Sequence, residues 1–403
     1  MRSRNRRHPG IVPILLIVIY LVGVIAGSTG GLAADEGAGS GQGENPEVVL
    51  EIVARLKHYY VRDVDVASLL KAYLKTGTIK GMLESLKDPY TRYMDRVAFK
   101  EMQEDMKGVY EGIGVVIGIK DDRLTIVAPF EGSPGQKAGL KSGDHILHID
   151  GKPTKDMAVE YAATLIRGKK GTSVTLGIER GEKNERFEVK VIREEVKVPH
   201  VAGEIIKEKI GYVVLNAFLG EDTAGALDSK LNELQAKGMK GLILDLRYNS
   251  GGSLELAVEV ASRFVPPGLP VVHIIGRDNR RRTILADPAP KRFNLPMVAL
   301  VNEGTASASE ILCGALQDLK LATIVGVRTF GKGLVQTVFP LSDGSGVSIT
   351  TDEYLTAGGR AINEKGIEPD VVVKMPEPGK EKKVDVQLEA AIKILEERLR
   401  KAA

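Results

Sequence analysis

The 403-residue sequence predicts a multidomain α/β protein with an N-terminal helical segment, a β module and an α/β core. Three observations predict this fold class. The chain is too long for one ordinary hydrophobic core. Residues 108–195 contain short apolar pieces punctuated by Gly and Pro, which is typical of a compact β module. From about residue 203, strand-like and helix-like segments alternate, which favours a largely parallel sheet covered by helices.

The composition fits an ordinary globular protein, with 43% hydrophobic and 27% charged residues. The net charge is +3, and four arginines lie in the first seven residues, so the rest of the chain is close to neutral. A near-neutral body argues against nucleic acid as a partner. The single cysteine, Cys313, excludes an internal disulfide, and its apolar neighbours predict a buried thiol without a catalytic role.

The N-terminal residues 1–33 read as a targeting segment. Basic residues precede the apolar run at 11–27, whose 17 residues are short for a membrane span and long for the core of a signal peptide. The flanking arginines predict export of the remaining chain to the periplasm or cell envelope. An uncleaved inner-membrane anchor and a cleaved signal both stay open. Residues 34–46 are Gly-rich and predict a flexible linker.

Helical periodicity marks the two ends of the remaining chain. In the region 47–107, the apolar residues Val49, Ile52, Val53 and Leu56 recur at helical spacing, and no chemistry is evident there. The tail 376–403 predicts an amphipathic helix. This helix could pack on the core or make a homo-oligomer contact with the N-terminal helices, and both alternatives stay open.

The β module at 108–195 contains the strings GIGV at 112–115, SPGQKAGL at 133–140, and GDHILHIDG at 143–151. On these strings, the module resembles a PDZ domain in its bacterial arrangement. It implies that a peptide C-terminus adds as a strand beside the GIGV segment and that backbone N–H groups near 111–113 hold its carboxylate. The residues expected to bind the peptide are Gly112, Ile113, Gly114 and Val115. Alternatively, the module only packs against its neighbour.

The α/β core is expected at 196–375, and two polar strings in it follow buried strands. DLRYNSGGS follows the strand GLIL, and NEGTASASE follows the strand MVALV. Ligands of such sheets bind where strands end and helices begin. Taken alone, Ser307-Ala308-Ser309-Glu310 fits a helix capping box and needs no catalysis. Alternatively, the hydroxyl is a nucleophile, with the next backbone N–H and a bare N–H of the NSGG turn as oxyanion donors.

A nucleophilic serine also needs a base. Four of the histidines in the body lie in the helical region, the β module or the link after it, and His273 lies inside an apolar strand, which predicts a packed residue. Lys332, in the string TFGKGL, can serve if burial lowers its pKa enough to make it neutral. The alternative is a solvated turn lysine. A phosphate-binding loop is rejected because Gly333, instead of Ser or Thr, follows the lysine.

Together these pieces resemble the carboxy-terminal processing (tail-specific) serine peptidases. The matching strings are DLRYNSGG, VNEGTASASEILCGALQD, RTFGKGLVQT and ITTDEYLTAGGRAINEKGIEPD. The resemblance implies a crotonase/Clp-like α/β peptidase core and a mechanism that needs no metal or cofactor. The roles it implies are nucleophile for Ser307, general base for Lys332, orientation of the lysine for Gln336, and oxyanion N–H donors for Ala308 and Gly252. The chain departs from the family's pattern at Thr305 and at Ser250.

The expected function is therefore that of an exported serine endopeptidase that cleaves proteins near free, apolar C-termini, recruited by the PDZ-like module. Two rivals stay open: a catalytically silent PDZ scaffold on the same fold, and an acyl-transfer or hydratase enzyme with a similar oxyanion cradle. The basic loop 277–282 (RDNRRR) is expected to be solvated, with an acidic partner as the alternative.

Overall fold

The computed structural model describes residues 45–120, 122–181, 184–207, 209–289, 291–376 and 384–402. The apolar run at 11–27 lies outside them, and within them no helix is long and apolar enough to cross a membrane. The chain forms two compact units. One holds residues 111–194, and the other combines residues 45–110 with residues 195–402. The six-part division expected from the sequence stays a prediction.

The unit at 111–194 is an antiparallel sheet with two short helices. Its strand order is β3-β4-β5-β7-β8, with β6 beside β5. The interior is aliphatic, with Ile126, Ile149 and Leu176 fully buried. Strand β3 is at the edge of the sheet and pairs only with β4 within the described chain. The elements are β3 (Val115–Lys120), β4 (Arg123–Pro129), α5 (Pro134–Lys137), β5 (His145–Ile149), β6 (Lys152–Pro153), α6 (Val159–Ile166), β7 (Ser173–Arg180) and β8 (Glu185–Ile192).

The larger unit contains the expected α/β sheet, in the order β10-β11-β12-β15-β16-β19. All its pairings are parallel except that of β10 with β11. The elements are β10 (Val201–Ile206), β11 (Ile210–Leu215), α7 (Thr223–Ala236), β12 (Gly241–Asp245), α8 (Leu254–Ala261), β15 (Met297–Val301), α9 (Ala308–Asp318), β16 (Thr323–Gly326), β19 (Val371–Val372) and α10 (Val386–Ala402).

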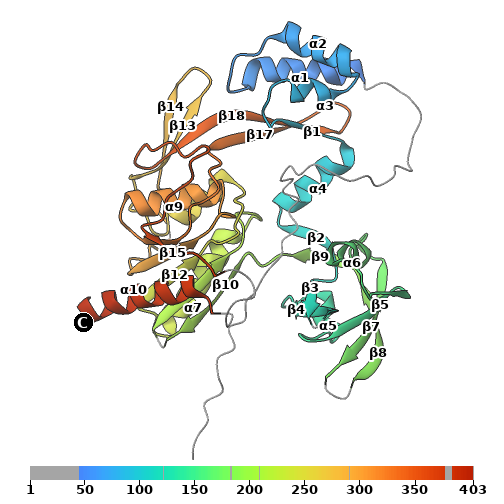
Figure 1. Cartoon of the computed structure of the whole chain (residues 1–403), viewed down its shortest axis with the longest axis vertical. Coiled ribbons are helices and arrows are strands. Elements are labelled where there is room, and N and C mark those ends of the chain that lie inside the picture. The colour runs from blue at the N-terminus through green and yellow to red at the C-terminus, as the bar shows by residue number, and fades with distance from the viewer. Residues whose placement is uncertain are drawn as a thin grey trace, which may run out of the picture. The chain divides into compact units, whose positions relative to one another are not determined.

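Helices cover both faces of this sheet. Leu242 and Leu244 of β12 pack with residues of α7, α8 and α9, whereas Ile243 packs with Ala391 and Leu395 of α10. Successive residues of a strand point to opposite faces, so strands buried on both faces are apolar throughout, as GLIL and MVALV are. The C-terminal helix α10 thus lies along β12 and β15 in this chain (Figure 1).

A second sheet of the larger unit is antiparallel. It runs β1-β18-β13-β14, and β17 pairs along β18. The apolar strand PVVHIIG, β13, belongs to this sheet and not to the parallel core, because it pairs antiparallel with β14 and β18. An apolar run does not indicate which sheet a strand joins. Here β13 forms a hairpin with β14, and this pairing places it in the antiparallel sheet. The strands are β1 (Arg92–Met94), β13 (Pro270–Gly276), β14 (Arg281–Leu285), β17 (Leu334–Pro340) and β18 (Gly346–Thr356).

The N-terminal helices pack on this second sheet (Figure 1). Ile52 and Leu56 of α1 share a core with Val347 and Ile349 of β18. Arg277 of the basic loop binds the carbonyl of Lys57 and the carboxylate of Asp63, so one of its arginines fastens α1 and is not merely solvated. The helices are α1 (Pro46–Tyr59), α2 (Val66–Thr76), α3 (Ile79–Glu84) and α4 (Arg96–Met106); β2 (Val109–Gly112) pairs with β9 (Glu194–Lys197).

Candidate active site

Ser307 lies in the turn between β15 and α9, immediately before the first helical residue. Its φ of 56° and ψ of −119° place a non-glycine residue in a strained region of the backbone map. The N–H of Glu310 donates to the carbonyl oxygen of Ser307 (2.8 Å), and the Ser307 hydroxyl lies beside this N–H in the arrangement of a capping box. The hydroxyl is therefore not the main acceptor of this N–H.

The other half of the expected capping box is present. The Glu310 carboxylate accepts the N–H of Ser307 (2.8 Å). Ser309 is buried, and its hydroxyl donates to the carbonyl oxygen of Asn249 (2.9 Å). Of the two serines, Ser309 therefore has the structural contact, which ties the start of α9 to the NSGG turn.

Asn249 organises that turn. Its carbonyl oxygen also accepts the N–H of Ala306 (3.0 Å), and its side chain both donates to the carbonyl oxygen of Leu215 (2.7 Å) and accepts the N–H of Gly251 (2.9 Å). Hydrogen bonds thus hold the turn despite its departure from the expected pattern at Ser250.

The N–H of Gly251 is committed to Asn249, which leaves the next glycine as the candidate donor. The N–H groups of Gly252 and Ala308 have no hydrogen-bond partner among the described residues. Gly252 has φ 140°, and a Cβ there would lie 2.1 Å from the carbonyl oxygen of Phe218. The fold therefore requires glycine at 252.

Ser307 and Lys332 are brought together through their backbones. The same oxygen of Glu310 that accepts the N–H of Ser307 also accepts the N–H of Lys332 (2.9 Å). On the other side, the Tyr354 hydroxyl can donate to the carbonyl oxygen of either Ser307 (3.0 Å) or Lys332 (2.5 Å). Burial raises the pKa of Tyr354, which keeps this hydroxyl protonated. Two side chains therefore hold both residues.

The ammonium of Lys332 faces an aromatic ring. Its Nζ lies 4.8 Å from the centroid of the Tyr90 ring. Burial lowers the pKa of Lys332, and the positive charge of Arg92 lowers it further, whereas Asp88 and Glu310 oppose the shift. Within the described part of the chain, Nζ has no hydrogen-bond or ion-pair partner. Three side chains of the region 47–107, where the sequence shows no evident chemistry, thus lie close enough to influence this lysine.

Gln336 lies on β17 beside Thr350 of β18, just after an irregularity in the strand pairing. Its Nε2 atom is buried without a hydrogen-bond partner. As far as the described residues show, no hydrogen bond joins the Ser307 hydroxyl, the Lys332 ammonium and the Gln336 amide to one another. The fold gathers the three predicted residues on adjoining segments but leaves their side chains unconnected in this state.

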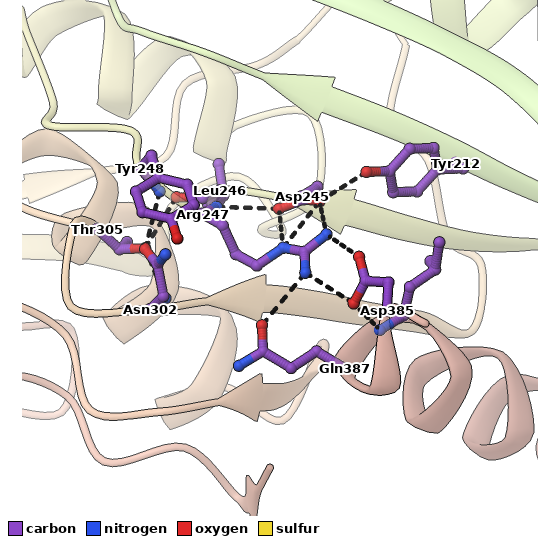
Figure 2. Close-up of polar contacts among 10 residues, drawn as sticks. Tyr212, Asp245, Leu246, Arg247, Tyr248, Asn302, Thr305, Asp385 and Gln387 are labelled. Carbon is purple, nitrogen blue, oxygen red and sulfur yellow. Dashed lines mark hydrogen bonds and ion pairs between the residues drawn. The ribbon is translucent and has the colours of Figure 1, made fainter. Parts of the chain in front are cut away.

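An ionic network surrounds Arg247, which precedes the NSGG turn in the sequence (Figure 2). The guanidinium of Arg247 is paired with Asp245 at the end of β12 and with Asp385 before α10, and it also reaches Gln387. The carboxylate oxygen of Asp245 that pairs with Arg247 (2.6 Å) also accepts the Tyr212 hydroxyl (2.7 Å). Burial disfavours the charge of Arg247, but the hydrogen bonds and negative charges of Asp245 and Asp385 together outweigh it and raise the pKa of the guanidinium. The C-terminal helix is thereby tied to the strand that leads into the turn.

The expected peptide-binding residues lie at the start of β3. Gly112, Ile113 and Gly114 are buried, and the side chain of Ile113 is part of the core. A Cβ at Gly135 would lie 2.7 Å from a methyl carbon of Val115, so this segment packs tightly against α5. The opposite edge of β3 has no strand partner among the residues described, as strand addition requires.

The remaining candidates have structural surroundings. Cys313 is fully buried in α9, and burial raises the pKa of its thiol. His273 is buried and lies within hydrogen-bond distance of the Thr283 hydroxyl and the Ala357 carbonyl oxygen (2.8 and 3.0 Å). No group of three or more His, Cys, Asp or Glu side chains in the described ranges could hold a metal ion.

The sequence of the chain matches models of known protein families. The sequence model of Peptidase family S41 matches residues 209–373, that of the PDZ domain matches 111–191, and that of the activating protease CtpB N-terminal domain matches 33–98. The carboxy-terminal processing protease CtpA of Bacillus subtilis is 39% identical over 76% of this chain and 65% of its own length. The carboxy-terminal-processing protease of Bartonella bacilliformis is 37% identical over 84% of this chain and 77% of its own length.

The solved structure of a photosystem II D1 C-terminal processing protease is 31% identical, with a TM-score of 0.53, covering 86% of this chain and 96% of that one. The chain thus has the fold and the PDZ domain of a serine-type peptidase. It belongs to the carboxy-terminal processing peptidases of family S41. It spans about two thirds of the first curated relatives, 65% and 66% of their lengths.

Proposed function

We propose that this chain is a serine endopeptidase in which Ser307 and Lys332 form the catalytic pair and which cleaves protein substrates near their C-termini. The main support is that the same two side chains hold Ser307 and Lys332 in place. The Glu310 carboxylate accepts the backbone N–H groups of the serine and the lysine, and the Tyr354 hydroxyl lies within hydrogen-bond distance of their carbonyl oxygens. Such a fixed pair meets the positional demand on a nucleophile and its base.

In the proposed reaction, neutral Lys332 accepts the proton of the Ser307 hydroxyl as its oxygen attacks the scissile amide carbonyl. The lowered pKa of the lysine, caused by burial, favours the neutral form. The unpartnered N–H groups of Gly252 and Ala308 bind the oxyanion of the tetrahedral intermediate. Lys332 then protonates the leaving amine, and water hydrolyses the acyl-enzyme.

Gln336 is proposed to orient the lysine during this cycle. Its buried, unpartnered Nε2 implies that a partner is supplied in the working arrangement, because an unsatisfied buried amide costs about 1–3 kcal/mol. We propose that the Lys332 side chain turns from the Tyr90 ring toward Ser307 and donates an N–H to the carbonyl oxygen of the Gln336 amide, which leaves the lone pair of the amine for the serine proton.

The PDZ domain is proposed to recruit the substrate by its free, apolar C-terminus. The peptide would add along the open edge of β3, with its carboxylate at the backbone of Gly112 and Ile113. We further infer export of the catalytic units, with residues 11–27 as signal or anchor, and place any homo-oligomer contact at the N- and C-terminal helices.

A cleavage assay tests the proposal. The purified full chain is incubated with a peptide that has a free apolar C-terminus and with the same peptide amidated at its C-terminus, and the cut is located by mass. Wild-type protein should cleave the free peptide near its end and the amidated one poorly, and Lys332→Ala should cleave neither. Binding without cleavage by the wild type would favour the scaffold, and transfer of the acyl group to an acceptor other than water would favour the acyl-transfer enzyme.

A further inference from the structure

The N-terminal segment supplies an aromatic ring to Lys332 from far away in the sequence. Tyr90 precedes β1 and is half-buried, and its ring lies 4.8 Å from the lysine Nζ. An ammonium over the face of an aromatic ring is attracted by the negative potential of that face. This attraction acts on the charged lysine and is lost when the amine is neutral.

The position of the ring is fixed by the turn that carries it. The side chain of Asp88 accepts the N–H of Tyr90 (2.9 Å) and the hydroxyl of Thr91 (2.7 Å). The Thr91 oxygen in turn accepts the N–H of Thr350 on β18 (3.1 Å). β18 is also the strand that carries Tyr354, so the ring and the backbone of the lysine share one support.

The surroundings keep the ring a neutral phenol. Burial and the negative charges of Asp88, Glu310 and Glu364 raise the pKa of Tyr90. The groups that face Lys332 are Asp88, Tyr90 and Arg92 from the N-terminal segment, Glu310 of α9, and Tyr354 of β18 through its hydroxyl. Of these, Tyr90 is the one in contact with the ammonium itself.

We propose that Tyr90 is a positioning residue that holds the Lys332 ammonium over its ring in the resting enzyme, so that the lysine has to leave the ring before it can deprotonate Ser307. Resting on the proposed function, this inference adds that the N-terminal segment controls when the base is available. Loss of the proton weakens the hold on the ring, and the neutral amine is then free to turn toward the serine.

The consequence is a shift in the acid limb of the pH–rate profile. A cation–π contact at a partly desolvated site is worth enough to move a pKa by about 0.4–1.5 units. Replacing Tyr90 by leucine retains an apolar neighbour but removes the ring, so kcat/KM should rise about 3- to 30-fold on the acid limb, and the limb should move to lower pH by that shift.

The test measures kcat/KM against pH for the full chain with a peptide substrate. Tyr90→Phe retains the ring face and should keep the wild-type limb, whereas Tyr90→Leu should shift it. Phenylalanine with one, two or three ring fluorines at position 90 keeps the shape of the ring and weakens the negative potential of its face stepwise. The acid limb should therefore move stepwise to lower pH. Tyr93→Leu, on the same segment and without a contact to Lys332, should leave the limb in place.

The inference would be overturned if the acid limbs of the pH–rate profiles of all the fluorinated variants coincided with that of Tyr90→Phe. This comparison does not need the leucine variant, so it decides the question even if Tyr90→Leu fails to fold. Lys332→Ala separates this failure from failure of the proposed function. If Lys332→Ala is inactive and the limb stays fixed across the series, only the role of Tyr90 is wrong. If Lys332→Ala keeps wild-type activity, Lys332 is not the base and both proposals are wrong.

Discussion

Replacing Glu310 by glutamine is the sharpest perturbation of the catalytic framework. The buried carboxylate accepts four hydrogen bonds: from the N–H groups of Ser307 (2.8 Å) and Lys332 (2.9 Å) on one oxygen, and from the Gly331 N–H (2.8 Å) and the Thr329 hydroxyl (2.5 Å) on the other. In either orientation, the amide nitrogen of a glutamine faces at least one backbone N–H. The substitution therefore loses at least one hydrogen bond and the charge that strengthens the others.

The expected cost follows from these contacts. A hydrogen bond to a charged group contributes about 1.5–3 kcal/mol and a neutral one about 1 kcal/mol, so one lost bond and three weakened ones lower the free energy of unfolding by about 3–5 kcal/mol. Because the carboxylate aligns the serine and the lysine, a displacement of about 1 Å lowers kcat/KM by roughly 100-fold. In the wild type, the negative charge of Glu310 raises the pKa of Lys332. The substitution removes this charge and should lower that pKa, so the acid limb of the pH–rate profile should move to lower pH.

Urea unfolding and the pH dependence of kcat/KM measure both effects. Glu303→Gln, an exposed carboxylate in the same turn, is the matched control and should change neither quantity appreciably. A Glu310→Gln protein with the stability and kcat/KM of the wild type would refute the view that this carboxylate aligns the pair.

Other variants test separate parts of the account. Burial lowers the pKa of Lys332 below its ordinary 10.5, so burying its charge costs free energy until the pH rises above the lowered value. Lys332→Met should therefore be more stable than wild type in urea at pH 7, with a gain that shrinks toward pH 10. Burial lowers the pKa of His200 to about 4, so acidification from about pH 6.5 to 4 should remove roughly 3 kcal/mol of stability, and His200→Leu should lack this loss in an unfolding series against pH. Asp385→Asn weakens the pairing with Arg247 and should lower the thermal midpoint and kcat more than Glu389→Gln, an exposed position of the following helix α10. Ser309→Ala removes one buried hydrogen bond and should cost about 1 kcal/mol of stability in denaturant while kcat stays within a few-fold of the wild type.

The sequence predicted the architecture well where the residues of one segment alone indicate its structure. The runs GLIL and MVALV are apolar at every position because both faces of their sheet are covered, and this reads directly as buried strands. The S-x-x-E string fits a helix start, and the Glu310 half of the capping box is present. The family and fold implied by the combined motifs are confirmed by the comparisons.

Contacts between distant segments could not be predicted in this way. No sequence pattern near Tyr90 predicts its contact with Lys332, because the contact depends on the pairing of β1 with β18. Arg247 and Asp385 are likewise joined only by the docking of α10. Glu310 was expected only to start a helix, and its second task, binding Lys332, depends on how the later loop folds back. The sheet that the strand PVVHIIG joins is likewise decided by tertiary structure, through its pairing with β14 and β18.

The central claim is that Ser307 attacks the peptide bond with Lys332 as its base. The most direct measurement is the cleavage rate of a peptide with an apolar C-terminus by purified full-length Ser307→Ala, compared with wild type and with Ser309→Ala at equal folded concentration. The account predicts no cleavage above the uncatalysed rate for Ser307→Ala and near wild-type cleavage for Ser309→Ala. Cleavage by Ser307→Ala at a rate approaching that of the wild type would contradict it.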